Sequence, residues 1–128
     1  MPRKPLIAVV DDDESIRETT KDLLDSAGFR AATFTSAEAF LKSTRLRGVS
    51  CLITDMRMPG MSGLELHDRL AASAIPIPTV LVTAYPEEPV RARALAAGVL
   101  CYLTKPFTAD ELLACINAAV RRRGAATR

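Results

Sequence analysis

Five short apolar runs, rich in Val, Ile, Leu and Thr, alternate along the chain with five longer segments of mixed polarity. Each run is continuously apolar, which is typical of strands buried on both faces of a parallel sheet. The predicted strands are residues 6–10, 30–34, 51–54, 79–83 and 99–103.

The segments between these runs have helical spacing and recognisable ends. Ser/Thr and Glu residues three positions apart predict capping boxes at three helix starts, namely Thr35/Glu38, Ser62/Glu65 and Thr108/Glu111. Gly28 is placed to close the first helix in a left-handed turn, and a fourth helix is expected over about residues 87–97. The last helix carries one apolar stripe, formed by Leu112, Leu113, Ile116 and Val120.

The alternation of strands and helices predicts a single α/β domain built on a five-stranded, doubly wound parallel sheet. A length of 128 residues with 48% hydrophobic content is sufficient for one substantial core. Ligands of such sheets bind beyond the carboxyl ends of the strands, near the switch in strand order. The residues that directly follow the strands are therefore the first candidates for function.

Three carboxylates occupy such positions: Asp11 and Asp12 after the first strand, and Asp55 after the third. Like charges in proximity are tolerated only through partial protonation or a bound cation. Oxygen ligands with no nearby His or Cys favour a hard ion, with Mg²⁺ the first choice. The alternative is a solvated turn capping the helix that starts at Glu14, and Asp13 is expected to belong to that turn.

A lysine and a hydroxyl follow the remaining strands at the same edge. Lys105 comes after the fifth strand and Thr83 ends the fourth. A lysine and a divalent ion together can neutralise a phosphoryl group carried on a carboxylate. Pro106 directly follows Lys105, and the bond between them can adopt the cis form that sharp turns require.

Charge and cysteine content add limits to the function. The formal charge of +2 comes from four arginines in residues 121–128, because residues 1–120 hold 13 Lys/Arg against 15 Asp/Glu. The folded body is therefore not expected to bind nucleic acid. Cys51, Cys101 and Cys115 lie in apolar stretches and are expected to be buried, reduced thiols. No signal peptide or apolar run of ~20 residues is present, which predicts a cytoplasmic protein without membrane contact.

Four segments of the chain resemble the receiver domains of two-component response regulators. They are Val9–Asp12, Thr54–Gly63, Val82–Ala84 and Thr104–Phe107. The stretch from Arg57 to Gly63 is most similar to FixJ-like regulators. The resemblance implies a CheY-like fold with strand order 2-1-3-4-5 and a receiver domain over residues 1–122. Residues 123–128 are expected to be a basic flexible tail or the start of a linker.

The resemblance also implies a role for each candidate site residue. Asp55 matches the acceptor of a phosphoryl group from a sensor histidine kinase, and Thr83 and Lys105 match the groups that contact this phosphoryl group. Tyr102 matches an aromatic residue that moves inward when Thr83 engages the phosphoryl group, although a plain role as a core or surface aromatic is the alternative. The Mg²⁺ ligands would be Asp11, Asp12, Asp55 and the backbone carbonyl of Arg57. The fourth helix, fifth strand and fifth helix would form a switching surface, with homodimerisation as one outcome.

Two other functions compete with a phosphorylated switch. A Mg²⁺-dependent aspartyl-phosphate phosphatase would need a second acid two residues after Asp55, where Arg57 stands. A flavin-binding domain of the same fold would need a Gly/Ser/Thr-rich loop after the first strand, where acidic residues stand instead. The side chains of Arg57 and Tyr85 either overhang the site or are solvated. His67, the single histidine, is expected on the surface of the third helix.

Overall fold

The computed structural model describes residues 4–126, with side chains as far as residue 122. Five parallel strands form one sheet in the order β2-β1-β3-β4-β5, which confirms the predicted fold. The strands are β1 (Leu6–Val10), β2 (Arg30–Phe34), β3 (Val49–Asp55), β4 (Thr79–Thr83) and β5 (Cys101–Thr104). Three predicted ranges are unchanged, whereas β3 is longer at both ends and β5 lies slightly later in the chain than predicted.

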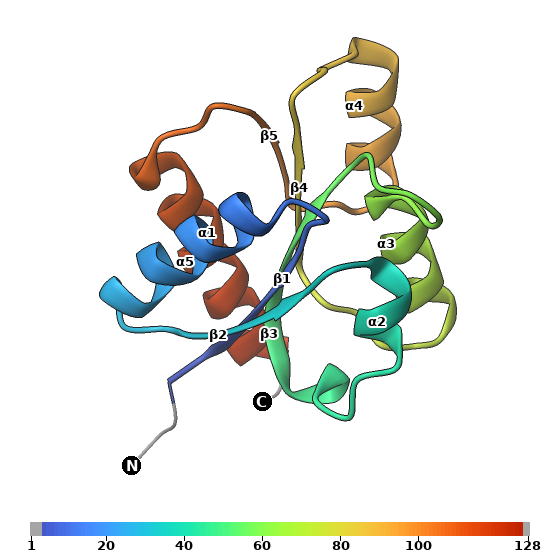
Figure 1. Ribbon diagram of the computed structural model, residues 1–128. Helices are drawn as coiled ribbons and strands as arrows, with labels where there is room; N and C mark the ends of the chain where they lie inside the picture. Colours follow the sequence, from blue (N-terminus) through green and yellow to red (C-terminus); the bar gives the residue numbers. More distant parts are fainter. Residues whose placement is uncertain (1–3, 127–128) are drawn as a thin grey trace.

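Helices cover both faces of the sheet (Figure 1). On one face lie α1 (Glu14–Ser26) and α5 (Ala109–Ala126); on the other lie α2 (Ala37–Leu41), α3 (Gly63–Ala72) and α4 (Glu88–Ala96). A 3-10 turn, η1 (Leu46–Gly48), precedes β3. Helix α5 continues to Ala126, so the segment expected as a tail begins as helix; the domain boundary after residue 122 stays a prediction. No helix in the described part of the chain is long and apolar enough to cross a membrane.

Each face of the sheet has its own apolar core. Leu6, Ala8 and Val10 of β1 belong to a cluster with Phe40 of α2 and Leu66 of α3. The intervening residues of β1, Ile7 and Val9, belong to a second cluster with residues of α1 and α5, among them Leu24, Leu112 and Ile116. This division follows from strand geometry, since successive side chains point to opposite faces. A strand buried on both faces must be apolar throughout, as the sequence pattern indicated.

The helix ends agree with the sequence at most positions. Ser62 and Glu65 form the predicted capping box of α3, and Thr108 and Glu111 form the corresponding reciprocal pair before α5. Gly28 has a φ of +89°, consistent with the predicted left-handed helix end. The predicted box at Thr35 and Glu38 is wrong, because α2 is capped by Ser36, whose hydroxyl accepts from the Ala39 N–H.

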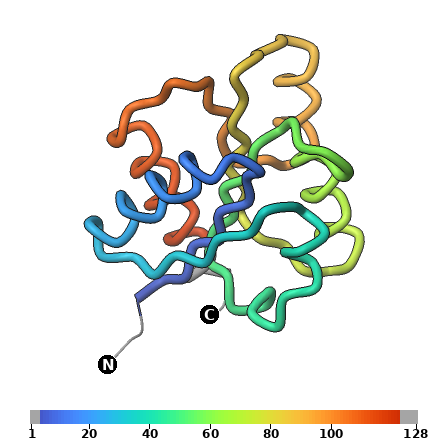
Figure 2. The backbone as a smooth tube through the Cα atoms, in the orientation of Figure 1, coloured from blue at the N-terminus to red at the C-terminus, as the bar shows by residue number. Residues whose placement is uncertain are grey.

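All five strands are parallel, so their carboxyl ends share one edge of the sheet. The loops after β1 and β3 both leave at this edge and lie close together in the backbone tube (Figure 2). The fold therefore gathers Asp11, Asp12, Asp55, Thr83 and Lys105 on the same side of the molecule.

Candidate functional site

The first strand ends in a tightly held turn. Asp11 is buried, and its Oδ1 accepts a hydrogen bond of 2.9 Å from the Asp13 N–H. The Arg17 guanidinium donates to the Asp11 backbone carbonyl at 2.7 Å. Asp13 caps α1 by accepting from the Ile16 N–H, which confirms the separate role predicted for it. The turn thus gives the three consecutive carboxylates different positions. Asp13 caps the helix, whereas Asp11 and Asp12 are left for the candidate site.

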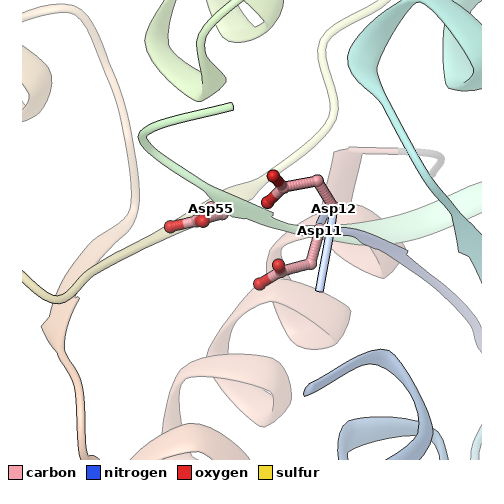
Figure 3. Close-up of side chains that lie close together, drawn as sticks. All are labelled: Asp11, Asp12 and Asp55. Atoms are coloured by element: carbon pink, nitrogen blue, oxygen red, sulfur yellow. The ribbon is translucent and has the colours of Figure 1, made fainter. Parts of the chain in front are cut away.

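Asp55, at the end of β3, completes an acidic cluster with this pair. One carboxylate oxygen from each of Asp11, Asp12 and Asp55 lies within 4.8 Å of the others. Figure 3 shows the three carboxyl groups close together, two from the end of β1 and one from β3. Three converging oxygen donors of this kind suit a hard divalent ion that keeps several waters. The residues present therefore fit Mg²⁺, which would screen the mutual repulsion of the carboxylates.

The electrostatics of Asp55 reflect this crowding. Burial raises the pKa of Asp55, and the charges of Asp11 and Asp12 raise it further. Lys105 opposes both effects and lowers this pKa. Its Nζ lies 3.3 Å from Oδ2 of Asp11 and 3.5 Å from Oδ1 of Asp55. Lys105 therefore supplies part of the positive charge that the cluster requires.

Thr83 lies at the end of β4, and its backbone is joined to β5. The Lys105 N–H donates to the Thr83 carbonyl at 2.8 Å, so the two predicted site residues are fixed to one another. The Thr83 side chain is buried, and its hydroxyl accepts from the Tyr85 N–H at 3.1 Å. The bond between Lys105 and Pro106 is cis, the form that the sequence allowed.

A hollow of about 300 Å³ lies beside the site, and the half-buried Tyr102 is part of its wall. Met56, Tyr85 and Val90 also line it. At its rim, Arg57 donates to Glu87 at 2.7 Å, and its guanidinium lies 5.6 Å from the centroid of the Tyr85 ring. Both Arg57 and Tyr85 have exposed side chains at the rim of this hollow. Tyr102 thus borders open space on the side of Met56 and Val90.

The loop between β3 and α3 is held by contacts that the sequence did not indicate. Glu38, expected in a helix cap, instead accepts from the Met61 N–H at 3.0 Å. A Cβ on Gly60 would lie 2.6 Å from the Glu38 carboxylate, and Gly60 has a φ of +81°. The Gly63 N–H closes the loop on the Met56 carbonyl at 3.0 Å. These contacts fix the loop that carries Arg57.

His67 lies outside the site and is not on the surface, so that prediction is wrong. It is buried in α3, where its Nε2 lies 3.0 Å from the Ala97 carbonyl and its Nδ1 lies 3.3 Å from the Thr79 hydroxyl. The helical pattern of the sequence correctly places His67 in α3. Its hydrogen-bond partners, however, lie on β4 and at the end of α4, which no local pattern indicates. Its role is to join these three elements.

Comparison with protein families decides the classification. A family model described as "Response regulator receiver domain" matches residues 7–117. The chain belongs to this receiver-domain family. Receiver domains are signalling domains of two-component systems rather than classical enzymes, which favours the switch over both competing functions.

Individual relatives agree with this membership. The receiver domain is 38% identical over 122 residues to the transcriptional regulatory protein FixJ of Bradyrhizobium diazoefficiens, and 39% identical over 119 residues to nodulation protein W of the same organism. These alignments cover 95% and 93% of this chain, but only 60% and 52% of the two relatives. The chain thus spans little more than half the length of these curated relatives.

Solved structures give the same result. The receiver domain superposes on the response regulator StyR with a TM-score of 0.90 at 44% identity, covering 97% of this chain and 63% of StyR. The structure named FixJ-N gives a TM-score of 0.83 at 33% identity, covering 94% of this chain and 96% of that one. The likeness to FixJ-like regulators expected from residues 57–63 is confirmed.

Proposed function

We propose that this receiver domain accepts a phosphoryl group on Asp55 from the phosphohistidine of a sensor histidine kinase. The observation that carries the proposal is the position of the Lys105 ammonium between Asp11 and Asp55, inside a cluster of three carboxylates. Asp55 is the only one of the three that lies on β3, at the end of a strand next to the strand-order switch. There its free oxygen can attack an incoming phosphorus atom.

The chain supplies positioning and charge for this transfer. Asp11, Asp12, Asp55 and the Arg57 carbonyl would hold Mg²⁺, which neutralises charge on the transferred group when bound. Lys105 pairs with a phosphoryl oxygen, exchanging its contact with Asp55 for one with the new group. Thr83 Oγ1 releases the Tyr85 N–H and donates its hydroxyl proton to a second oxygen. Charge-assisted hydrogen bonds of this kind are about twice as strong as neutral ones.

The movement of Thr83 is transmitted to a surface. Tyr102 turns into the hollow beside Met56, and α4, β5 and α5 adopt the active arrangement for dimerisation or output control. Shifting such an equilibrium from mostly inactive to mostly active requires about 5.5 kcal/mol of differential stabilisation. The phosphoryl group acts through this α4-β5-α5 surface, and the receiver domain itself makes no direct contact with nucleic acid.

Phosphorylation of Asp55 and Asp13 variants tests the proposal. With a small acyl phosphate and Mg²⁺, wild-type protein is expected to gain one phosphoryl group that is labile to alkali and hydroxylamine, and Asp55→Asn to gain none. Asp13→Asn is the matched control, since Asn also caps helices and Asp13 lies outside the cluster. Full labelling of Asp55→Asn would overturn the proposal. Steady hydrolysis of an aryl phosphate by wild-type protein would instead favour the phosphatase.

A further inference from the structure

Two cysteines that the signalling chemistry does not use lie side by side between β5 and α5. Cys101 and Leu103 of β5 belong to the apolar cluster that faces α1 and α5. Tyr102 between them packs instead against a smaller third cluster, formed by Leu64, Leu81, Ala94 and Val99. On α5, Cys115 lies in the buried stripe with Leu112, and it belongs to the same cluster. Burial raises the pKa of the Cys115 thiol, and the neighbouring Cys101 thiol raises it further. Both thiols are free.

The two thiols differ in their access to solvent. Cys101 is only partly buried, because β5 is the edge strand of the sheet. Cys115 is more deeply buried, with 8% of its surface exposed. Burial and the neighbouring Cys101 raise the pKa of Cys115 to about 12, so Cys115 is a poor direct target for an oxidant and reacts as the second thiol. A small oxidant would therefore meet Cys101 first.

The third cysteine provides an internal comparison. Cys51 lies on β3 in the same cluster, but it is fully buried. Burial raises its pKa far above the usual thiol range, and it offers no surface to an oxidant. One chain therefore contains an accessible thiol, a partner in contact with it, and a shielded thiol.

We propose that Cys101 and Cys115 form an oxidisable pair, in which a peroxide converts the two thiols into an intramolecular disulfide that ties β5 to α5. The Cys101 sulfur first takes an oxygen atom from hydrogen peroxide and becomes a sulfenic acid, with release of one water. The Cys115 sulfur then attacks the Cys101 sulfur. The hydroxyl group leaves with the Cys115 proton as a second water. The two thiols lose two electrons and two protons in total, and the peroxide is reduced to two waters.

The disulfide would act on the same surface that the proposed function uses. Cys101 is the neighbour of Tyr102 in β5, and a covalent link to α5 limits the relative movement of β5 and α5. Oxidation is therefore expected to change phosphorylation-linked dimerisation. This consequence rests on the proposed function, whereas formation of the disulfide does not.

Thiol counting on the whole chain tests the site. Reduced protein is treated with a small excess of hydrogen peroxide, denatured, and analysed for free thiols and by peptide mapping. Wild-type protein is expected to pass from three free thiols to one, with a mass loss of about 2 Da and a linked peptide pair containing Cys101 and Cys115. Dithiothreitol should restore all three. Three unreacted thiols, a sulfinic acid at Cys101 beside a free Cys115, or a disulfide only between two chains would overturn the proposal.

Single variants identify the partners. Cys51→Ala should still lose two thiols, whereas Cys101→Ser and Cys115→Ser should form no intramolecular disulfide. The peptide map of wild-type protein remains decisive if the buried Cys115→Ser variant fails to fold. In a separate assay, dimerisation is compared for phosphorylated protein before and after oxidation. A disulfide that leaves dimerisation unchanged contradicts the regulatory consequence, whereas reduced protein that takes no phosphoryl group contradicts the proposed function instead.

Discussion

The Nζ of Lys105 lies 3.5 Å from Oδ1 of Asp55, a contact that reaches from β5 across β4 to β3. The two side chains are only 18% and 13% exposed, so solvent screens their attraction much less than that of a surface pair. The same ammonium also contacts Asp11. Burial raises the pKa of Asp55 overall, and the Lys105 ammonium limits this rise although the charges of Asp11 and Asp12 add to it.

Replacing Lys105 by Met should therefore slow phosphorylation. The substitution keeps the length of the side chain but removes the charge that is proposed to pair with the phosphoryl group. Loss of one such preorganised contact typically costs about 10²-fold or more in rate. The rate of labelling from a small acyl phosphate at fixed Mg²⁺ measures the effect. Lys21→Met, which removes an exposed helix pair with Asp25, is the control. Equal rates for both variants would contradict the role given to Lys105.

Removal of the Asp55 charge should stabilise the fold near neutral pH when no divalent ion is present. A carboxyl group with a raised pKa binds its proton more tightly in the folded state than in the unfolded state. The free energy of unfolding therefore falls as pH rises from the ordinary value of 3.8 through the raised one, and this cost persists at higher pH. The Asp55→Asn protein has no carboxyl group to ionise at this position, so it does not lose this unfolding free energy as pH rises. Its greater stability relative to wild type should therefore vanish below pH 3.8, the ordinary pKa of the carboxyl group. Denaturant unfolding of both proteins in a chelator, at several pH values, measures this difference.

Gly63 is expected to tolerate no side chain. A Cβ at this position would meet the backbone carbonyl of Asp55 and lie 2.7 Å from Leu81. Gly63→Ala should lower stability by about 1–3 kcal/mol, as overpacking does, and should also slow phosphorylation because it displaces Asp55. Gly48→Ala is the control, since no atom lies within 4 Å of its added Cβ. A Gly63→Ala protein with wild-type stability and phosphorylation rate would contradict this prediction, because it would show that the end of β3 can move to accept the methyl group.

The sheet and most of the site could be predicted because they depend on local pattern and on a general property of parallel sheets. Continuous apolar runs specify strands buried on both faces, and the carboxyl ends of those strands meet at one edge. This is why Asp11, Asp55 and Lys105 could be grouped from sequence, although they are far apart along the chain. The cap of α1 at Asp13 was equally local, since it depends on a backbone N–H three residues away.

The two errors concern residues whose partners are distant in sequence. Glu38 has the spacing of a capping box with Thr35, but its carboxylate is used by the Met61 N–H in another loop. His67 has the spacing of a helix surface, but the Ala97 carbonyl and the Thr79 hydroxyl lie against it. A polar side chain carries no local pattern that specifies such a partner. Only the packing of α2 on the loop, and of α3 on β4 and α4, decides it.

Glu38 is expected to influence ion binding although it does not belong to the acidic cluster. Its carboxylate holds the Met61 N–H, and so restrains the loop in which the Arg57 carbonyl is a proposed ligand. Glu38→Ala should weaken Mg²⁺ binding severalfold, whereas Glu38→Gln, which keeps an oxygen acceptor, should weaken it less. Competition between Mg²⁺ and paramagnetic Mn²⁺ measures both affinities without phosphorylation. If wild type and Glu38→Ala bind Mg²⁺ with the same affinity, the contact between Glu38 and the Met61 N–H does not influence ion binding.

His67 should matter for stability and not for phosphoryl chemistry. Its ring joins α3 to the Ala97 carbonyl at the end of α4 and to the Thr79 hydroxyl of β4. Truncation to Ala leaves a cavity and removes the imidazole partner of the Ala97 carbonyl, which should cost about 1–3 kcal/mol for that polar group alone. The Thr79 hydroxyl keeps its hydrogen bond to the Ile77 carbonyl. Denaturant unfolding measures this loss, with Asp68→Ala on the exposed side of α3 as the control. Because His67 lies outside the cluster of Asp11, Asp12 and Asp55, the folded His67→Ala protein should still be labelled on Asp55 at close to the wild-type rate. Unchanged stability together with a large loss of labelling would instead place His67 in the signalling chemistry.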